Sequence, residues 1–163
     1  MEKPASPIRP TDDEARALAR RLIHEARHGA LAVIDPASGA PMVSRVATVP
    51  GPDGLPLMLV SDLSAHTVAL RTNPVCSLLV GEPGAKGDPL TYPRLGLQGE
   101  ARFVRHGDPE HAALAAHYLR LQPKAKLYIG FGDFSLMRLV LSGGHLNGGF
   151  GKAFVLTPGD LAT

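Results

Sequence analysis

Two segments of the chain carry side chains suited to holding an anion, and the first is a strand with an arginine in it. Arg45 lies in a mostly apolar strand expected over residues 42–49. Strand alternation places it on the same face as Val43 and Ala47. A guanidinium donates two parallel hydrogen bonds to a phosphate or a carboxylate. Arg45 therefore either lies at a sheet edge or faces a bound anion.

The second segment is a hydroxyl-rich turn that leads from a strand expected over residues 55–60 into a helix expected over residues 65–72. It reads Ser-Asp-Leu-Ser-Ala-His-Thr from position 61. Free amides at a helix N-terminus form an anion site. The turn is explained equally well if Asp62 or Ser64 simply serves as the N-cap of the helix. His66 is unusual here, because a histidinium opposes the helix dipole unless an anion lies beside it. We interpret the turn as a phosphate site opposite Arg45.

A glycine-dense run over residues 143–153 is the third feature. Of the nine residues from Gly143 to Gly151, five are glycine, and the run also holds His145 and Lys152. Glycines inside strand-like sequence suit a sharp turn or close approach to a bulky, flat ligand. A hairpin loop ahead of the next strand explains the run equally well by itself. The possible anion sites at Arg45 and at the turn from position 61 favour the interpretation as a ligand site.

Composition narrows the classes of function. The 163 residues predict a single domain, 1–163, with residues 1–10 as a flexible tail. A net charge of +2, 5% aromatic residues and no Trp argue against nucleic acid. The lone Cys76 is expected to be buried and inert, and His24 and His28 lack a third ligand, so no metal site is expected. No segment resembles a signal or a membrane span, which predicts a cytoplasmic protein.

The expected elements are one helix, then seven strands with two helical interruptions. The first helix begins with a capping box over residues 11–14 and stops at Gly29. The last helix begins with Asp108 as N-cap and Pro109 as its first residue. The strands are expected over residues 30–34, 42–49, 55–60, 75–80, 92–104, 135–141 and 150–156. Short strands joined mostly by hairpins predict a mainly β protein, an antiparallel barrel with peripheral helices.

Taken in order, several stretches resemble the pyridoxamine-5'-phosphate-oxidase-like FMN-binding split barrels, most closely their haem-utilisation (HugZ-type) branch. The matching stretches are residues 41–49, 59–70, 75–82 followed by 88–90, 93–101, and 145–153 with its Gly-Gly-Phe-Gly. The resemblance covers most of residues 30–156. It implies a six-stranded antiparallel split β-barrel with Greek-key connections, a homodimer, and FMN bound at the dimer interface.

The resemblance also implies roles for particular positions. Arg45 matches the family's phosphate-binding arginine, and residues 46–48 match the strand whose backbone runs along the flavin ring. Residues 64–67 fall where the family binds the phosphate, with His66 in place of a cation. Arg94 opens a strand that often contacts the cofactor. The implied cofactor-binding residues are Arg45, Val46, Ala47, Thr48, Ser61, Asp62, Ser64, His66, Thr67 and Arg94.

Two functions follow from the resemblance. The first is an FMN-dependent oxidoreductase acting on an unidentified small molecule, with His145, Lys152 and Tyr92 as candidates for substrate contact. The second is a haem-binding or haem-degrading protein with His145 as an axial ligand. The C-terminal Trp and the Arg-Leu-Ala-Pro ending of true pyridoxamine phosphate oxidases are not found in this sequence. Vitamin synthesis is therefore not expected.

Overall fold

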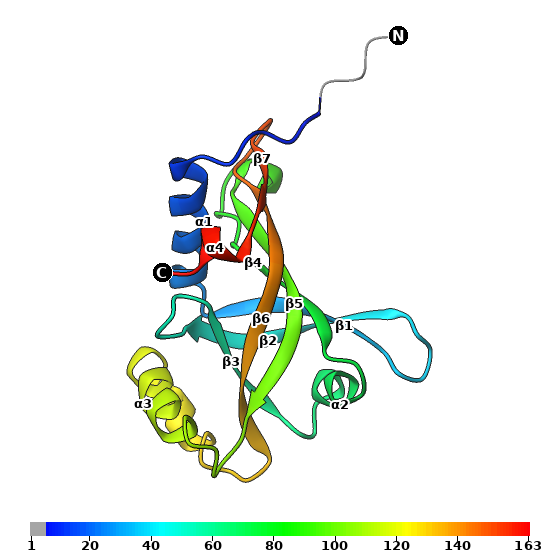
Figure 1. Cartoon of the computed structure of the whole chain (residues 1–163), viewed down its shortest axis with the longest axis vertical. Coiled ribbons are helices and arrows are strands. Elements are labelled where there is room, and N and C mark those ends of the chain that lie inside the picture. Colours follow the sequence, from blue (N-terminus) through cyan, green and yellow to red (C-terminus); the bar gives the residue numbers. More distant parts are fainter. Residues whose placement is uncertain (1–5) are drawn as a thin grey trace.

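A closed antiparallel barrel dominates the computed structural model, which describes residues 6–163 (Figure 1). The strand order is β3-β2-β1-β4-β5-β6-β7, and β3 also pairs with β6, which closes the first six strands. The strands are β1 (His28–Ile34), β2 (Pro41–Pro50), β3 (Pro56–Ser61), β4 (Val75–Val80), β5 (Arg94–Val104), β6 (Phe134–Asn147) and β7 (Ala153–Leu156). Since β4 returns to lie beside β1, strands β1 to β4 form a Greek key. The predicted six-stranded Greek-key barrel is confirmed.

Four short helices lie around the barrel. They are α1 (Asp13–Glu25), α2 (Ala65–Thr72), α3 (His111–Leu121) and α4 (Pro158–Leu161), with 3-10 turns at Pro89–Thr91 and Pro123–Leu127. Figure 1 shows α1 beside α4 on one flank, α2 beneath β1, and α3 beyond β3. In the part of the chain that the structure describes, no helix is long and apolar enough to cross a membrane.

Two helix ends differ from the sequence-based expectation at the start of the chain. Asp12, not Thr11, caps α1, and its side chain accepts a hydrogen bond from the Ala15 N–H at 2.8 Å. The Thr11 hydroxyl instead donates to the Val155 carbonyl of β7 at 2.8 Å. The prediction of a Thr11 cap was wrong because the sheet edge takes up that hydroxyl.

Gly29 does not end α1, which stops at Glu25 with Ala26 as its C-cap. It lies within β1, where a Cβ would come 2.8 Å from the Leu79 carbonyl oxygen. The glycine is therefore needed for close packing against β4 and not for a helix stop. Sequence alone does not separate these two uses of glycine.

The start of α3 was also predicted two residues too early. The helix begins at His111, with Glu110 at the N-cap position. The Asp108 carboxylate accepts from the Arg105 N–H at 2.8 Å, and its carbonyl accepts from the His111 N–H at 3.1 Å. Asp108 thus shapes the turn that precedes the helix.

The N-terminal segment is attached to the sheet over part of the expected tail. Ile8 forms a parallel bridge with Ala153, and the Arg9 N–H donates to the Ala153 carbonyl at 2.8 Å. These residues are therefore docked along β7 and do not form a free tail. Residues 1–5 of the expected tail lie outside the described residues.

The core has two parts, because the strands bury side chains on both of their faces. The barrel interior holds Leu31, Val46, Leu78, Leu95, Leu97 and Met137, and Ile23 of α1 packs on this cluster. A second cluster forms outside the barrel under α3 and contains Tyr118, Val49, Leu57, Leu59 and Leu136. Cys76 is buried in the interior as expected, and its burial raises the pKa of the thiol to about 11.

Two glycines of β5 allow a direct test of this packing. Gly99 lies at a bulge in the β5–β6 ladder, and a Cβ there would overlap the backbone of Val140. A Cβ on Gly96 would meet nothing nearer than the His145 carbonyl oxygen at 3.9 Å. We expect Gly99→Ala to lower the free energy of unfolding by about 1–3 kcal/mol, as overpacking does. Gly96→Ala, the matched control, should change it by no more than about 0.5 kcal/mol in urea unfolding. Equal stability of the two variants would contradict the described packing.

Candidate functional site

Several residues expected to bind a cofactor lie where β2 and β3 separate and α2 begins. The β2–β3 ladder ends at the pair of Ala47 and Leu59. Arg45 precedes Ala47 by two residues, and Ser61 follows Leu59 by two residues. Strand alternation therefore places both side chains on the outer face of the barrel, beyond the end of the ladder. Helix α2 begins at Ala65, four residues after Ser61.

Ser61 and Asp62 are engaged in a polar network at this end of the barrel. The Ser61 hydroxyl donates to the Asp133 carboxylate at 2.9 Å. The Asp62 carboxylate pairs with Arg71 of α2 and lies 3.5 Å from Arg105, which follows β5. Two arginines thus neutralise Asp62, so its charge does not oppose an anion at the helix start. Arg71, Arg105 and Asp133 were not predicted, because the topology and not local sequence brings them here.

The first turn of α2 keeps donors that the rest of the described chain does not use. Ser64 occupies the N-cap position without a side-chain capping bond, and its carbonyl accepts from the Thr67 and Val68 N–H groups. The first amides of a helix have no partner within the helix. The Ser64 hydroxyl and the amides of Ala65 and His66 therefore form a donor set suited to a phosphate or a carboxylate.

His66 is directed toward β2 and is not a surface cation. Its Nδ1 lies at hydrogen-bond distance, 3.0 Å, from the Ser44 hydroxyl, and its Nε2 is buried without a partner. Burial lowers the pKa of His66 below that of a free histidine. Desolvation therefore disfavours the histidinium that the sequence analysis considered at this helix start. Thr67 is fully buried beside it, so its hydroxyl faces the core.

Only one side chain of residues 46–48 reaches the outer face. Val46 and Thr48 are buried, and Ala47 lies between them on the outer side of β2. Contact between this strand and a cofactor would therefore involve the backbone and the Ala47 methyl group. This is compatible with the expected position along a flat ring.

Arg45 and His145 belong to one cross-strand row on the outer face of the sheet. Through successive strand pairs the row runs Arg45, Ala30, Leu79, Gly96, His145 and Val155, in the order β2, β1, β4, β5, β6 and β7. Leu79 and Val155 are 47% and 46% exposed, and Gly96 leaves the middle of the row open. The side chains of Arg45 and His145 are exposed, and neither makes a hydrogen bond or an ion pair with a residue of the described range.

The two polar residues of this row, Arg45 and His145, are well separated. Four strand spacings of about 4.8 Å place them roughly 19 Å apart along the sheet. The row therefore combines a cation, a shallow apolar floor and an imidazole. We refer to the six residues from Arg45 to Val155 as the outer row.

Tyr92 and Arg94 do not join the residues around α2. Arg94 pairs with Asn147, at the end of β5 and β6 opposite to the end that meets β3. Its guanidinium donates to the carbonyls of Leu90 and Tyr92 at 3.1 and 3.3 Å, while the Tyr92 hydroxyl donates to the Lys86 carbonyl at 2.7 Å. Both side chains hold the loop before β5.

The glycine run divides into two structural parts. Residues 143 and 144 lie inside β6, which continues to Asn147 instead of ending at Leu141. Residues 148–152 form the turn to β7, where Gly149 and Gly151 have φ of 115° and 68° and the Gly148 N–H donates to the Lys152 carbonyl at 2.8 Å. The hairpin interpretation is confirmed for this turn, β7 begins at Ala153 and not at residue 150, and Lys152 is exposed on the turn.

The partial burial of His66 predicts a pH dependence of stability. As the pH falls below about 6.5, the unfolded chain takes up a proton that the folded chain resists. Stability is therefore complete above that pH and is lost on acidification toward the lower pKa of the folded state. His66→Gln keeps a polar partner for Ser44 but cannot titrate, so urea unfolding at a series of pH values should show a smaller loss. The pKa of His111 is also lowered by burial, but its contribution is common to both proteins. Parallel stability curves would contradict the burial of His66.

The chain matches known proteins over most of its length. Residues 10–160 match the family model described as CREG, beta-barrel. Over 103 residues the chain is 41% identical to the "Non-canonical heme oxygenase HOZ, chloroplastic" of Arabidopsis thaliana, a match that covers 62% of this chain and 30% of that protein. The chain therefore corresponds to less than a third of that relative.

Solved structures extend the likeness to the whole fold. The protein Atu2129 of Agrobacterium tumefaciens, of unknown function, is 36% identical with a TM-score of 0.80, over 98% of this chain and 66% of its own. A heme binding protein of Mycobacterium smegmatis is 32% identical with a TM-score of 0.80, over 94% of this chain and 61% of its own. This chain spans under two thirds of both.

One more distant structure shows the fold alone. It is a pyridoxinephosphate oxidase family protein of Clostridium acetobutylicum, 15% identical with a TM-score of 0.66, over 93% of this chain and 99% of its own. The predicted likeness to the pyridoxamine-phosphate-oxidase-like barrels is thereby confirmed at the level of fold. With residues 10–160 matched, the chain belongs to the CREG β-barrel family and shares its fold with those split barrels.

Proposed function

We propose that this protein binds haem on the outer face of its barrel, with His145 as an axial ligand. The outer row carries the proposal, because it sets an exposed imidazole without a partner in the described range beside the open Gly96 and two exposed apolar side chains. Histidine is a common ligand of haem iron, and apolar walls suit a macrocycle. Two relatives support the proposal, since a 41% identical protein is named a heme oxygenase and a 32% identical one a heme binding protein.

Arg45 would bind the carboxylates of the ligand from a second copy of the chain. Within one protomer three strands of the curved barrel wall separate Arg45 from His145, so the two side chains leave the outer face in different directions and do not converge on one ligand. The outer face also exposes Val43, Leu79 and Val155, with exposed fractions of 64%, 47% and 46%. Covering such a face favours association. We therefore propose a homodimer with the cofactor at its interface.

FMN is the second candidate, and the donors around α2 favour it. The Ser64 hydroxyl, the first amides of α2 and the guanidinium of Arg45, which follows the Ser44 that contacts His66, suit a phosphate group. The outer side of β2 at Ala47 would then lie along the ring. In this alternative the protein is an FMN-dependent oxidoreductase for a small molecule. With either group the cofactor supplies the redox chemistry, while the protein binds and orients it.

Titration with hemin tests the first proposal. We expect a saturable Soret band with the wild-type protein, and His145→Ala should bind hemin at least about tenfold more weakly because the axial ligand is lost. Gly96→Val should also weaken binding, because a side chain would fill the open middle of the outer row without a backbone clash. His24→Ala, a change at an exposed histidine on α1, is the matched control and should leave the titration unchanged.

An unchanged hemin titration in both His145→Ala and Gly96→Val would refute the outer row as the haem site. FMN titration of the same proteins, followed by quenching of flavin fluorescence, separates the two candidates. If FMN is the ligand, Arg45→Ala should weaken it by about tenfold to a hundredfold, as expected for one charge-assisted hydrogen bond of about 1.5–3 kcal/mol. His145→Ala should then have the smaller effect.

The dimer has its own test. Sedimentation at micromolar concentration should give twice the mass of the chain, with an interface on the order of 1,600 Å². Leu79→Glu should shift the protein to a monomer, because it places a charge in the middle of the outer row. Leu127→Glu changes a side chain that is 79% exposed on a 3-10 turn, and it should leave the dimer intact. A monomeric wild-type protein would rule out the proposed interface.

A further inference from the structure

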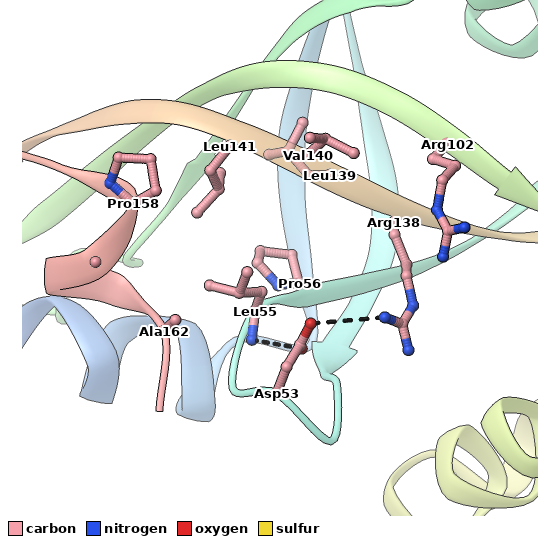
Figure 2. A pocket seen from close by; sticks show the side chains of 11 residues that line it. Asp53, Leu55, Pro56, Arg102, Arg138, Leu139, Val140, Leu141, Pro158 and Ala162 are labelled. Atoms are coloured by element: carbon pink, nitrogen blue, oxygen red, sulfur yellow. Dashed lines mark hydrogen bonds and ion pairs between the residues drawn. The ribbon is translucent and has the colours of Figure 1, made fainter.

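A cavity of about 490 Å³ lies between β6, the turn from β2 to β3, and α4 (Figure 2). Most of its wall is apolar. The apolar lining consists of Leu55, Pro56, Leu139, Val140, Leu141, Pro158 and Ala162. Arg102, Arg138 and Asp53 provide the charged side chains of the lining. This combination of an apolar wall and a few polar groups is typical of small-molecule sites, and the volume lies in their usual range.

Arg138 is the unusual residue of this cavity. Its side chain is only 28% exposed, yet it makes no hydrogen bond with any residue in the described range. Its nearest carboxylate oxygens belong to Asp53 at 3.7 Å and Glu110 at 3.9 Å, both beyond ordinary hydrogen-bond length. In contrast, Arg102 donates to Glu110 at 2.7 Å. The Arg138 guanidinium therefore retains N–H donors that no residue among 6–163 accepts from at hydrogen-bond length.

Neighbouring groups fix this arrangement. Arg102 and Arg138 are directly opposite each other in the β5–β6 ladder, which is unfavourable for like charges unless acidic groups compensate. Asp53 and Glu110 supply that compensation. One Asp53 oxygen accepts from the Leu55 N–H at 3.1 Å, and Figure 2 shows the other oxygen directed toward Arg138. Because the turn holds Asp53 in this way, its carboxylate stays at a distance from the guanidinium.

The charges indicate what kind of ligand fits. The formal charges of the two arginines and the two acidic residues sum to zero. The cavity should therefore tolerate a ligand with one negative charge better than a ligand with two. A planar carboxylate matches the fork of a guanidinium with open donors. Leu55, Val140 and Leu141 extend the site away from Arg138 as an apolar surface. We propose that this cavity binds a small monocarboxylate with an apolar body, its carboxylate on Arg138.

Titration with hexanoate, followed by amide chemical shifts of the labelled protein, tests the proposal. The amides of residues 139–141 and Leu55 should shift and saturate together. Hexanol has the same apolar body without the charge and should bind at least about tenfold more weakly, because it cannot form the charge-assisted pair. Arg138→Gln should weaken hexanoate by a similar factor, and Arg138→Lys should restore part of the affinity. Arg120→Gln, at an exposed arginine of α3 outside the cavity, is the control and should bind as the wild type does.

A second variant keeps the test decisive if Arg138→Gln does not fold. Val140→Glu places a carboxylate at an exposed position on the cavity wall and should abolish hexanoate binding. Equal binding of hexanol and hexanoate, or full hexanoate binding by Val140→Glu, would overturn the proposal. Binding by Arg138→Gln with unchanged affinity would do the same. Since Arg138 is not part of the outer row, hemin binding should persist in Arg138→Gln, which separates this site from the cofactor site.

Discussion

The pairing of β3 with β6 is the contact on which the architecture depends. It joins segments far apart in the sequence, from Leu57 opposite Arg138 to Ser61 opposite Phe134, and it converts an open sheet into a barrel. Because the barrel is closed, side chains on the inner face of its strands pack in the main core. Side chains on part of the outer face pack in a second core under α3. The same pairing brings Asp133 to Ser61, so the polar turn before α2 is a product of closure.

Closure also explains why we propose the cofactor site on the outer face. The interior is filled by apolar side chains and leaves no room for a cofactor. Helices α1 and α3 cover other parts of the surface, and the outer row remains accessible across six strands. Small residues such as Ala30 and Gly96 keep the middle of this surface shallow, while Arg45 and His145 stand at separate positions along it. In the proposed function, a flat ligand and a second copy of the chain would both meet this surface.

The sequence predicts an element well where local chemistry decides its ends. The helix at residues 65–72 was predicted with its observed bounds, because Ser64 precedes it and Asn73-Pro74 cannot continue it. Strand 75–80 was likewise predicted in full. Thr11 and Gly29 were misassigned because β7 and β4, respectively, use them in tertiary contacts that no local pattern reveals. For the same reason Arg45 and His145 were recognised only as single residues. The row that they share depends on the register of the paired strands. The hydrogen-bond contact between His66 and Ser44 depends on how α2 packs against β2.

The docked N-terminal segment bears on how the folded chain avoids aggregation. β7 is the last strand of the described sheet, and an unpaired strand edge is a template for adding another chain. The Arg9 N–H donates a hydrogen bond to the Ala153 carbonyl, and the Thr11 hydroxyl donates to the Val155 carbonyl two residues further along. Only four residues long and already engaged at two of its outward carbonyls, β7 offers little free backbone to an intruding strand. The first described residues thus protect the edge of β7, which limits the addition of a foreign strand at this end of the sheet.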